Sequence, residues 1–225
     1  MQNSSVKRIF DKFGVRFLLS ASQKVESISL SEIKPIVLVG AFDEGFALGE
    51  YSRWETSSRK RTKLGNLIHQ FKYEQNRHSG ELLTGLVSEF INSNVILKSA
   101  ELILTVPPSF KSQPFDPVSF TAERVKQRAG IRWEKEIFVR TRLTRPQKEV
   151  VGKESKQLNV INTFKIAKPI DLKGKRILLL DDIIASGATL DELSSMLRLA
   201  GADKIYVLVL AKSVCPGMSD SSGRR

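Results

Sequence analysis

The last third of the chain has the clearest pattern of apolar and polar positions. Residues 177–180 and 205–210 are continuous apolar runs, which is typical of buried strands. Between these runs, apolar residues recur at helical spacing and Gly201 marks the predicted helix end: Leu190, Leu193, Leu197 and Ala200. A strand, a helix and a strand in this order predict a βαβ unit and therefore a parallel sheet.

Further elements are predicted upstream of this unit. Short strands are expected at residues 101–106 and 137–139, and a helix at 121–129 that stops at Gly130. Two helices fit the apolar spacing of residues 64–90, with an interruption at 73–80. Nearer the N-terminus, strands are predicted at 15–19, 36–42 and 46–51, with Asp43-Glu44-Gly45 closing a hairpin between the last two.

These elements predict an α/β fold with a parallel sheet flanked by helices. Residues 1–60 are expected to form a small β-rich appendage and residues 61–212 the core. Residues 213–225 are rich in serine, glycine and arginine and are predicted to be a disordered tail.

Composition adds a strong basic excess. The 225 residues include 36 Lys and Arg against 24 Asp and Glu, a formal net charge of +12. Such an excess favours polyanionic partners, either phosphorylated small molecules or nucleic acid, although solubility alone also accounts for it. The single cysteine, Cys215, excludes an internal disulfide and a cysteine-rich zinc site. No apolar run approaches the ~18 residues of a membrane helix, and residues 1–10 lack a secretory signal, so a cytoplasmic protein is expected.

The candidate chemistry lies directly after the strand at 177–180. Asp181 and Asp182 are expected at its carboxyl end, where open α/β sheets bind ligands. A turn of small residues then leads into a helix, and its backbone N–H groups can converge on an anion: Ala185, Ser186, Gly187, Ala188 and Thr189. Two carboxylates beside a phosphate cradle suit a ribose 5-phosphate. The alternative is a buried strand, a turn and a helix with no ligand.

This segment resembles the signature of type I phosphoribosyltransferases, which bind 5-phosphoribosyl-1-pyrophosphate. Residues 36–212 resemble one branch of that superfamily, the ComF-type phosphoribosyltransferase-like proteins. Three further stretches carry this resemblance: Leu67-Ile-His-Gln-Phe-Lys-Tyr73, Val106-Pro107-Pro108, and Arg140-Thr-Arg-Leu-Thr-Arg-Pro-Gln147 followed by Lys156 and Asn159. The chain departs from the family in three respects. It has no N-terminal zinc module, and it keeps only Phe115 of a family motif that follows the prolines. It also has Ala185 at the position where purine-salvage enzymes carry an acidic residue.

The resemblance implies roles for individual residues. Asp181 and Asp182 would be the catalytic residues that face the ribose hydroxyls, and residues 185–189 would hold the 5′-phosphate. Residues of the loop after the first core strand and of a basic mobile loop would contact the pyrophosphate: Pro107, Pro108, Ser109, Lys111, Arg142, Arg145 and Gln147. Mg²⁺ would arrive with the pyrophosphate and would not be held by protein side chains alone. The two prolines fit a rigid turn without a binding role equally well. The basic loop has a similar alternative, a solvated loop that contacts no ligand.

Two functions follow as expectations. The first is a phosphoribosyltransferase that transfers the phosphoribosyl group from phosphoribosyl pyrophosphate to an unidentified nitrogenous acceptor. The second is a non-catalytic phosphoribosyl-binding protein in DNA uptake or single-stranded nucleic-acid handling. A basic cluster with one aromatic residue is the candidate nucleic-acid surface, although a charged loop before a helix has the same pattern: Arg53, Trp54, Arg59, Lys60 and Arg61. The acceptor, the general base and the oligomeric state, a dimer included, stay open.

Overall fold

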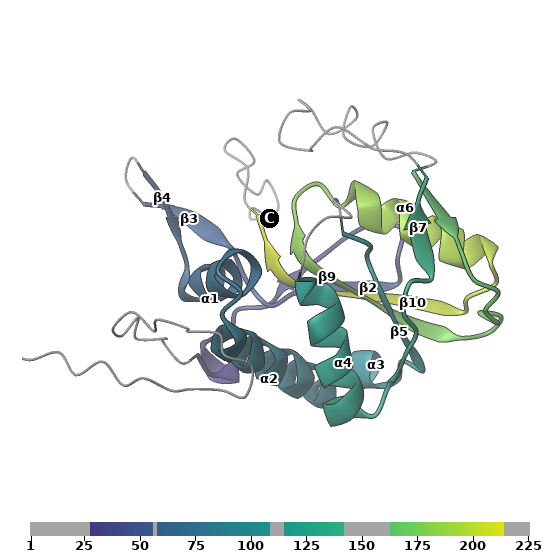
Figure 1. The fold of residues 1–225 in the computed structure, drawn as a ribbon, viewed down its shortest axis with the longest axis horizontal. Helices are drawn as coiled ribbons and strands as arrows, with labels where there is room; N and C mark the ends of the chain where they lie inside the picture. The colour runs from purple at the N-terminus through teal and green to yellow at the C-terminus, as the bar shows by residue number, and fades with distance from the viewer. Residues whose placement is uncertain (1–27, 56–57, 109–114, 142–162, 214–225) are drawn as a thin grey trace, which may run out of the picture.

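The fold is built around one six-stranded sheet (Figure 1). The computed structural model describes residues 28–55, 58–108, 115–141 and 163–213. The strand order is β1 (Ile36–Val37), β2 (Glu44–Ala47), β10 (Lys204–Lys212), β9 (Arg176–Ile184), β5 (Leu102–Thr105) and β6 (Arg132–Trp133). All neighbouring strands are parallel except β1 and β2. The predicted α/β class is therefore confirmed.

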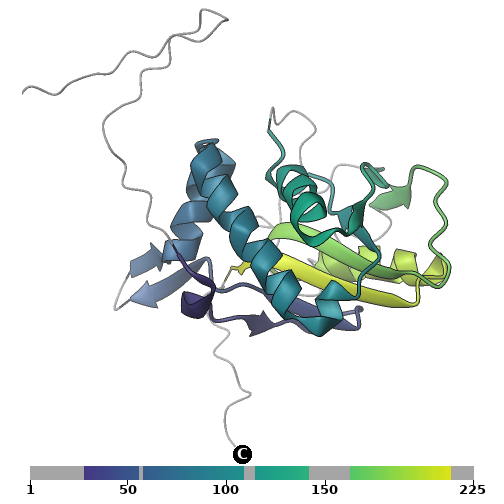
Figure 2. The same ribbon diagram turned by 90° about the horizontal axis from the view of Figure 1, so that it is seen from below.

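Helices cover both faces of this sheet (Figures 1 and 2). One face carries α1 (Lys63–Tyr73), α2 (Arg77–Ser93) and α4 (Pro117–Ala129), and the other carries α6 (Ala188–Leu199). The short helices are η1 (Leu30–Glu32) and α3 (Val95–Lys98). Two small antiparallel ribbons stand apart from the sheet: β3 (Ser52–Glu55) with β4 (Ser58–Arg61), and β7 (Phe138–Arg140) with β8 (Phe164–Ile166).

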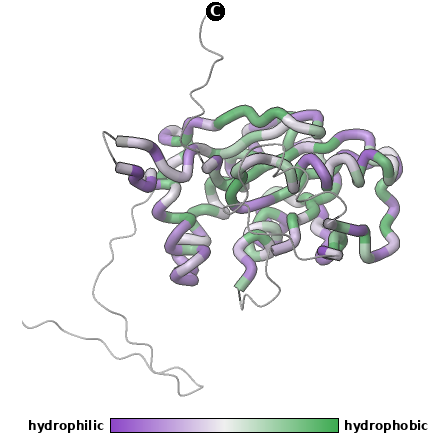
Figure 3. The backbone as a smooth tube through the Cα atoms, turned by 90° about the horizontal axis from the view of Figure 1, so that it is seen from above, coloured by the Kyte–Doolittle hydropathy of each residue, from purple (hydrophilic) through white to green (hydrophobic). Residues whose placement is uncertain are grey.

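The central strand β9 is apolar because both of its faces are covered. Leu178 and Leu180 pack into the cluster beneath α1, α2 and α4. Ile177 and Leu179 point to the opposite face and pack beneath α6. Figure 3 shows the hydrophobic strands running through the middle of the molecule. This two-residue period explains why a continuous apolar run is a strand rather than a helix here.

The helix boundaries follow local capping chemistry. The Thr62 hydroxyl accepts a hydrogen bond from Gly65 N at the start of α1, and the Asn76 side chain accepts one from Ser79 N at the start of α2. α4 begins four residues before the predicted start because Asp116 caps it and Pro117 occupies its first turn. The predicted interruption at 73–80 was too long, since only residues 74–76 separate α1 from α2.

The N-terminal strands needed correction. β1 and β2 do form the predicted hairpin, but they cover only two and four residues, and Glu44 and Gly45 lie in β2 rather than in the turn. β2 also pairs in parallel with β10, from Glu44 opposite Tyr206 to Ala47 opposite Val209. These strands of the 1–60 segment therefore extend the main sheet. The predicted strand at 15–19 and the tail from 214 lie outside the described residues.

No helix in the described part of the chain combines the length and the apolar character that a membrane span requires.

Candidate functional site

The strand order places a topological switch point between β5 and β9. β5 leads through α4 to β6 on one side, whereas β9 leads through α6 to β10 on the other. The connecting helices cover opposite faces of the sheet, and open α/β sheets bind their ligands at the carboxyl ends of the strands that flank such a switch point, here β5 and β9. Pro107 and Pro108 follow β5 at this point.

The two aspartates at this switch point lie within a strand. Pairing between β5 and β9 ends with Thr105 opposite Leu180 and a hydrogen bond of 3.0 Å from Val106 N to Leu180 O. β9 continues to Ile184 because β10 keeps pairing with it. Asp181 and Asp182 therefore belong to β9 and do not follow it, which corrects the predicted strand end at residue 180. They still lie just beyond β5, at the predicted edge of the sheet.

Asp182 forms an ion pair with Lys72 of α1. Strand alternation directs Asp182 to the same face as Leu180, toward α1, and its Oδ2 lies 2.5 Å from the Lys72 Nζ. The side chains are 20% exposed for Lys72 and 13% for Asp182. Burial alone would lower the pKa of the Lys72 ammonium, but the carboxylates of Asp182 and Asp181 outweigh burial and raise it. Lys72 is therefore a fully charged partner for Asp182.

Asp181 has the opposite electrostatic character. Burial raises the pKa of its carboxyl group to about 8, and the neighbouring Asp182 carboxylate adds to the rise. Asp182 N donates a hydrogen bond of 2.8 Å to Asp181 Oδ1. At neutral pH the pair therefore consists of a protonated acid, Asp181, and a carboxylate, Asp182.

The turn after β9 leaves the start of α6 without a side-chain cap. Gly187 occupies the N-cap position with φ 85° and ψ −10°, a left-handed conformation that favours glycine. No side chain caps the helix at this position, although Ser186 Oγ lies 3.5 Å from Ala188 N. The predicted segment 185–189 thus ends at a helix N-terminus whose amides can accept an external anion.

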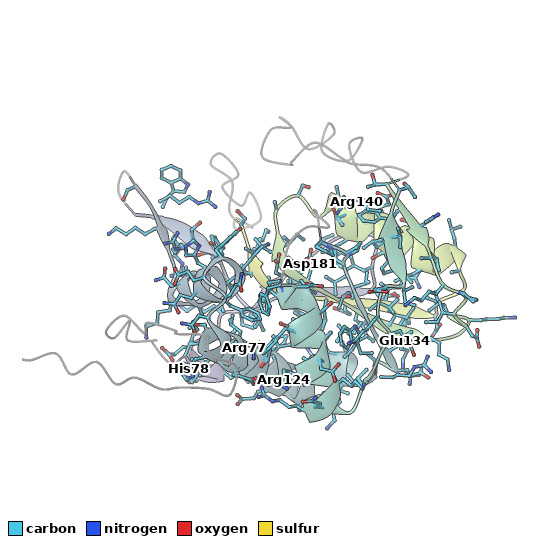
Figure 4. The ribbon with its side chains drawn as sticks, in the orientation of Figure 1. Arg77, His78, Arg124, Glu134, Arg140 and Asp181 are labelled. Carbon is cyan, nitrogen blue, oxygen red and sulfur yellow. The ribbon has the colours of Figure 1, made fainter. Side chains whose placement is uncertain are left out.

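A half-buried arginine stands on the α6 side of the aspartates. The guanidinium of Arg140 lies 4.6 Å from the centre of the Phe164 ring. Burial lowers its pKa, while the carboxylates of Glu192 and Asp181 act in the opposite direction. Figure 4 shows Arg140 and Asp181 in the same upper part of the molecule, well away from Arg77, His78 and Arg124. Glu192 in turn accepts a hydrogen bond of 2.7 Å from Thr163 N.

The structure therefore brings together some of the predicted residues and adds others. Asp181, Asp182, Pro107, Pro108 and the segment 185–189 lie around the switch point. Five predicted residues fall outside the described part of the chain: Ser109, Lys111, Arg142, Arg145 and Gln147. Lys72 and Arg140 were not predicted as site residues. The sequence signal for Lys72 was its place within the family-like 67–73 stretch.

The basic cluster near residue 60 is a ribbon rather than a loop. In the β3–β4 pair, Arg53 stands opposite Lys60 and Trp54 opposite Arg59. Trp54 is 51% exposed, and all residues of β4 are exposed. The Arg59 guanidinium donates hydrogen bonds to Ser52 Oγ and Ser213 Oγ, at 2.6 and 3.0 Å. The ribbon thus presents a tryptophan among cations on a fixed scaffold.

Among residues 28–55, 58–108, 115–141 and 163–213, no three or more His, Cys, Asp or Glu side chains gather in a way that could hold a metal ion.

Comparison with known proteins agrees with this geometry. Residues 127–222 match the phosphoribosyl transferase domain family. The chain is 24% identical over 157 residues to the DNA utilization protein YhgH of Escherichia coli O6:H1, covering 67% of this chain and 68% of that protein. It is 28% identical over 158 residues to competence protein F of Haemophilus influenzae, with the same shares covered.

Two further similarities concern phosphoribosyl enzymes. Ribose-phosphate pyrophosphokinase of Thermoplasma acidophilum is 45% identical over 64 residues, or 26% of this chain, and the chain spans only about a fifth of that enzyme's length. The crystal structure of purine phosphoribosyltransferase from Pyrococcus horikoshii matches with a TM-score of 0.38 and 15% identity, covering 64% of this chain and 92% of that one. Taken with the domain match and the two longer relatives, the acidic pair and small-residue turn of β9 support a ComF-type phosphoribosyltransferase-like family for this chain.

Proposed function

We propose that this protein binds 5-phosphoribosyl-1-pyrophosphate and transfers its phosphoribosyl group to a nitrogenous acceptor, releasing pyrophosphate. The observation that carries the proposal is the meeting of the acidic pair with the uncapped start of α6 at the β5–β9 switch point. A phosphorylated ribose has the two features that such a site complements, an anionic phosphate and vicinal hydroxyls. We further propose that this reaction takes place in the cytoplasm.

Each part of the site would hold one part of the substrate. The amides of residues 185–189 would receive the 5′-phosphate, favoured by the positive end of α6. The protonated Asp181 would donate a hydrogen bond to one ribose hydroxyl and the ionised Asp182 would accept one from another. Pro107 and Pro108 would set the backbone that approaches the pyrophosphate. Positioning and electrostatic stabilisation of the oxocarbenium-like charge at C1 would supply most of the rate enhancement.

Magnesium fits this scheme as a companion of the substrate. Asp182 is already paired with Lys72 and Asp181 is protonated at neutral pH, so neither carboxyl group is a free anionic ligand. Mg²⁺ would therefore be coordinated chiefly by the pyrophosphate and water. Its chemical contribution would be to neutralise charge on the leaving pyrophosphate.

Calorimetric titration of the protein with phosphoribosyl pyrophosphate, with and without Mg²⁺, tests the binding step. Release of pyrophosphate in the presence of candidate nitrogenous acceptors tests the transfer. Micromolar binding with acceptor-dependent pyrophosphate release is expected. Absence of binding at millimolar ligand would refute the site, whereas binding without release for any acceptor would favour a phosphoribosyl-binding protein that is not an enzyme.

The β3–β4 ribbon favours a second candidate function, the binding of single-stranded nucleic acid. Exposed Trp54 offers a stacking surface, and Arg53, Arg59, Lys60 and Arg61 surround it with positive charge. The names of the two longer relatives, DNA utilization protein and competence protein, are compatible with this reading. The chain has two tryptophans, and the other, Trp133, is buried. Quenching of tryptophan fluorescence by an oligonucleotide should therefore disappear in Trp54→Phe. Quenching that persists in that variant would remove the ribbon as the binding surface.

A further inference from the structure

The ion pair between Lys72 and Asp182 lies directly at the proposed phosphoribosyl site. α1 is anchored against the sheet by its buried face, so Lys72 is held over β9 by a helix that does not carry any of the predicted site residues. Both partners are mostly buried, at 20% and 13% exposure, and their charged atoms are 2.5 Å apart. A buried pair of this kind contributes little net stability compared with an apolar pair of similar size, so stability alone gives little reason for it.

Adjacent carboxylates create a problem for an anionic ligand. Asp181 and Asp182 stand next to each other in β9, and Asp116, which caps α4, adds a further negative charge that acts on Asp181. Within the described part of the chain, two positive groups act on this cluster, Lys72 on α1 and Arg140 on β7. A phosphorylated ribose carries at least one doubly charged group at neutral pH. The site must therefore neutralise its own carboxylates before such a ligand can approach them.

We propose that Lys72 is a specificity-determining residue of the phosphoribosyl site, which neutralises Asp182 and so allows a polyanionic sugar phosphate to bind beside two carboxyl groups. This inference rests on the proposed function, and it names Lys72 as the residue that allows an anionic sugar phosphate to bind beside the acidic pair. With Lys72 present, the Lys72–Asp182 ion pair carries no net charge. Without Lys72, the carboxyl pair retains a negative charge next to the ligand.

The matched test compares Lys72→Met, Lys72→Arg and Lys126→Met. Methionine keeps the length and apolar stem of Lys72 but removes its charge, and arginine restores the charge. Lys126 is an exposed residue of α4, so its replacement controls for the change in net charge alone. The measured quantity is the dissociation constant of ribose 5-phosphate, and of phosphoribosyl pyrophosphate with Mg²⁺, by calorimetry.

A unit charge about 6 to 12 Å from the ligand, at the effective dielectric constant of a protein surface, corresponds to a loss of roughly 10- to 100-fold. We expect that loss in Lys72→Met, with affinity recovered to within a few fold in Lys72→Arg and unchanged in Lys126→Met.

A folded Lys72→Met protein that binds within twofold of wild type would overturn the inference, as would an equal loss of affinity in Lys126→Met. If Lys72→Met does not fold, the wild-type protein labelled with ¹⁵N at lysine Nζ replaces it. The Lys72 signal, assigned by its disappearance in Lys72→Arg, should shift when ribose 5-phosphate is added, and a signal that stays unmoved at saturation would refute the inference. Failure of the wild-type protein to bind either ligand would instead refute the proposed function itself.

Discussion

Replacing Asp181 with asparagine should stabilise the protein while weakening its ligand binding. The pKa of this carboxyl group rises from an ordinary value of 3.8 to about 8 in the folded chain. Between these values the unfolded chain has released the proton and the folded chain has kept it. Stability contributed by the protonated group is therefore fully present below pH 3.8 and is lost as the pH rises toward 8.

The size of the effect follows from the distance between these pKa values. Each pH unit above 3.8 costs about 1.4 kcal/mol of unfolding free energy until the folded-state pKa is reached, so the cost approaches ~4 kcal/mol at pH 7. Asparagine stays neutral at every pH, and its side-chain oxygen can still accept the hydrogen bond from Asp182 N. Asp181→Asn should therefore match wild type near pH 4 and exceed it by up to ~4 kcal/mol at pH 7.

Urea unfolding at pH 5, 6 and 7 measures this difference. Asp203→Asn is the matched control, because Asp203 is an exposed residue in the turn before β10, and its replacement should change stability by less than ~0.5 kcal/mol at all three pH values. The reasoning would be refuted if Asp181→Asn were less stable than wild type at pH 7, or if its advantage did not grow from pH 5 to pH 7.

Three further outcomes are expected. Asp182→Asn should destabilise the fold by ~2 kcal/mol in the same urea assay, because it leaves the buried Lys72 ammonium of α1 without its carboxylate. A gain in stability would contradict the ion pair. Gly187→Val should lower the free energy of unfolding by ~1–2 kcal/mol, because position 187 has a left-handed backbone, and should abolish the thermal shift that ribose 5-phosphate induces. An unchanged thermal shift would exclude the start of α6 as the phosphate site. Charge reversal at Arg59, Lys60 and Arg61 should flatten the salt dependence of oligonucleotide binding, by a slope of ~0.7 per lost phosphate contact, and should leave the affinity for phosphoribosyl pyrophosphate unchanged. If the wild-type protein binds oligonucleotides without any salt dependence, the basic ribbon serves solubility only.

The sequence predicted the individual helices and strands better than it predicted which strands pair with one another. Apolar spacing located α1, α2, α6, β5, β9 and β10, because each of these elements has a buried face that sets a period of 3.6 or 2. It did not reveal that β2 pairs with β10, since strand pairing over 150 residues of sequence leaves no local periodicity. The end of β9 was misplaced for the same reason, as the pairing with β10 extends it past the aspartates.

The candidate site divides in a similar way. Asp181, Asp182 and Gly187 are contiguous in sequence, so a motif of ten residues was enough to identify them. Lys72 reaches the same place from a helix more than a hundred residues earlier, and only the packing of α1 on the sheet brings it there. Arg140 likewise depends on how the β7–β8 ribbon stands beside α6. Charged groups that act across elements are the part of a site that one sequence reveals least.

The two outer strands of the sheet have a consequence for the behaviour of the chain in solution. β1 and β6 each contain only two residues, whereas β9 and β10 in the middle contain nine apolar-rich residues each. Short outer strands present few unpaired backbone groups, which limits edge-to-edge aggregation between molecules. A truncation that removes the residues before Leu48 would uncover the long side of β10, so an expression plasmid that begins at the family-like helices should yield an insoluble product.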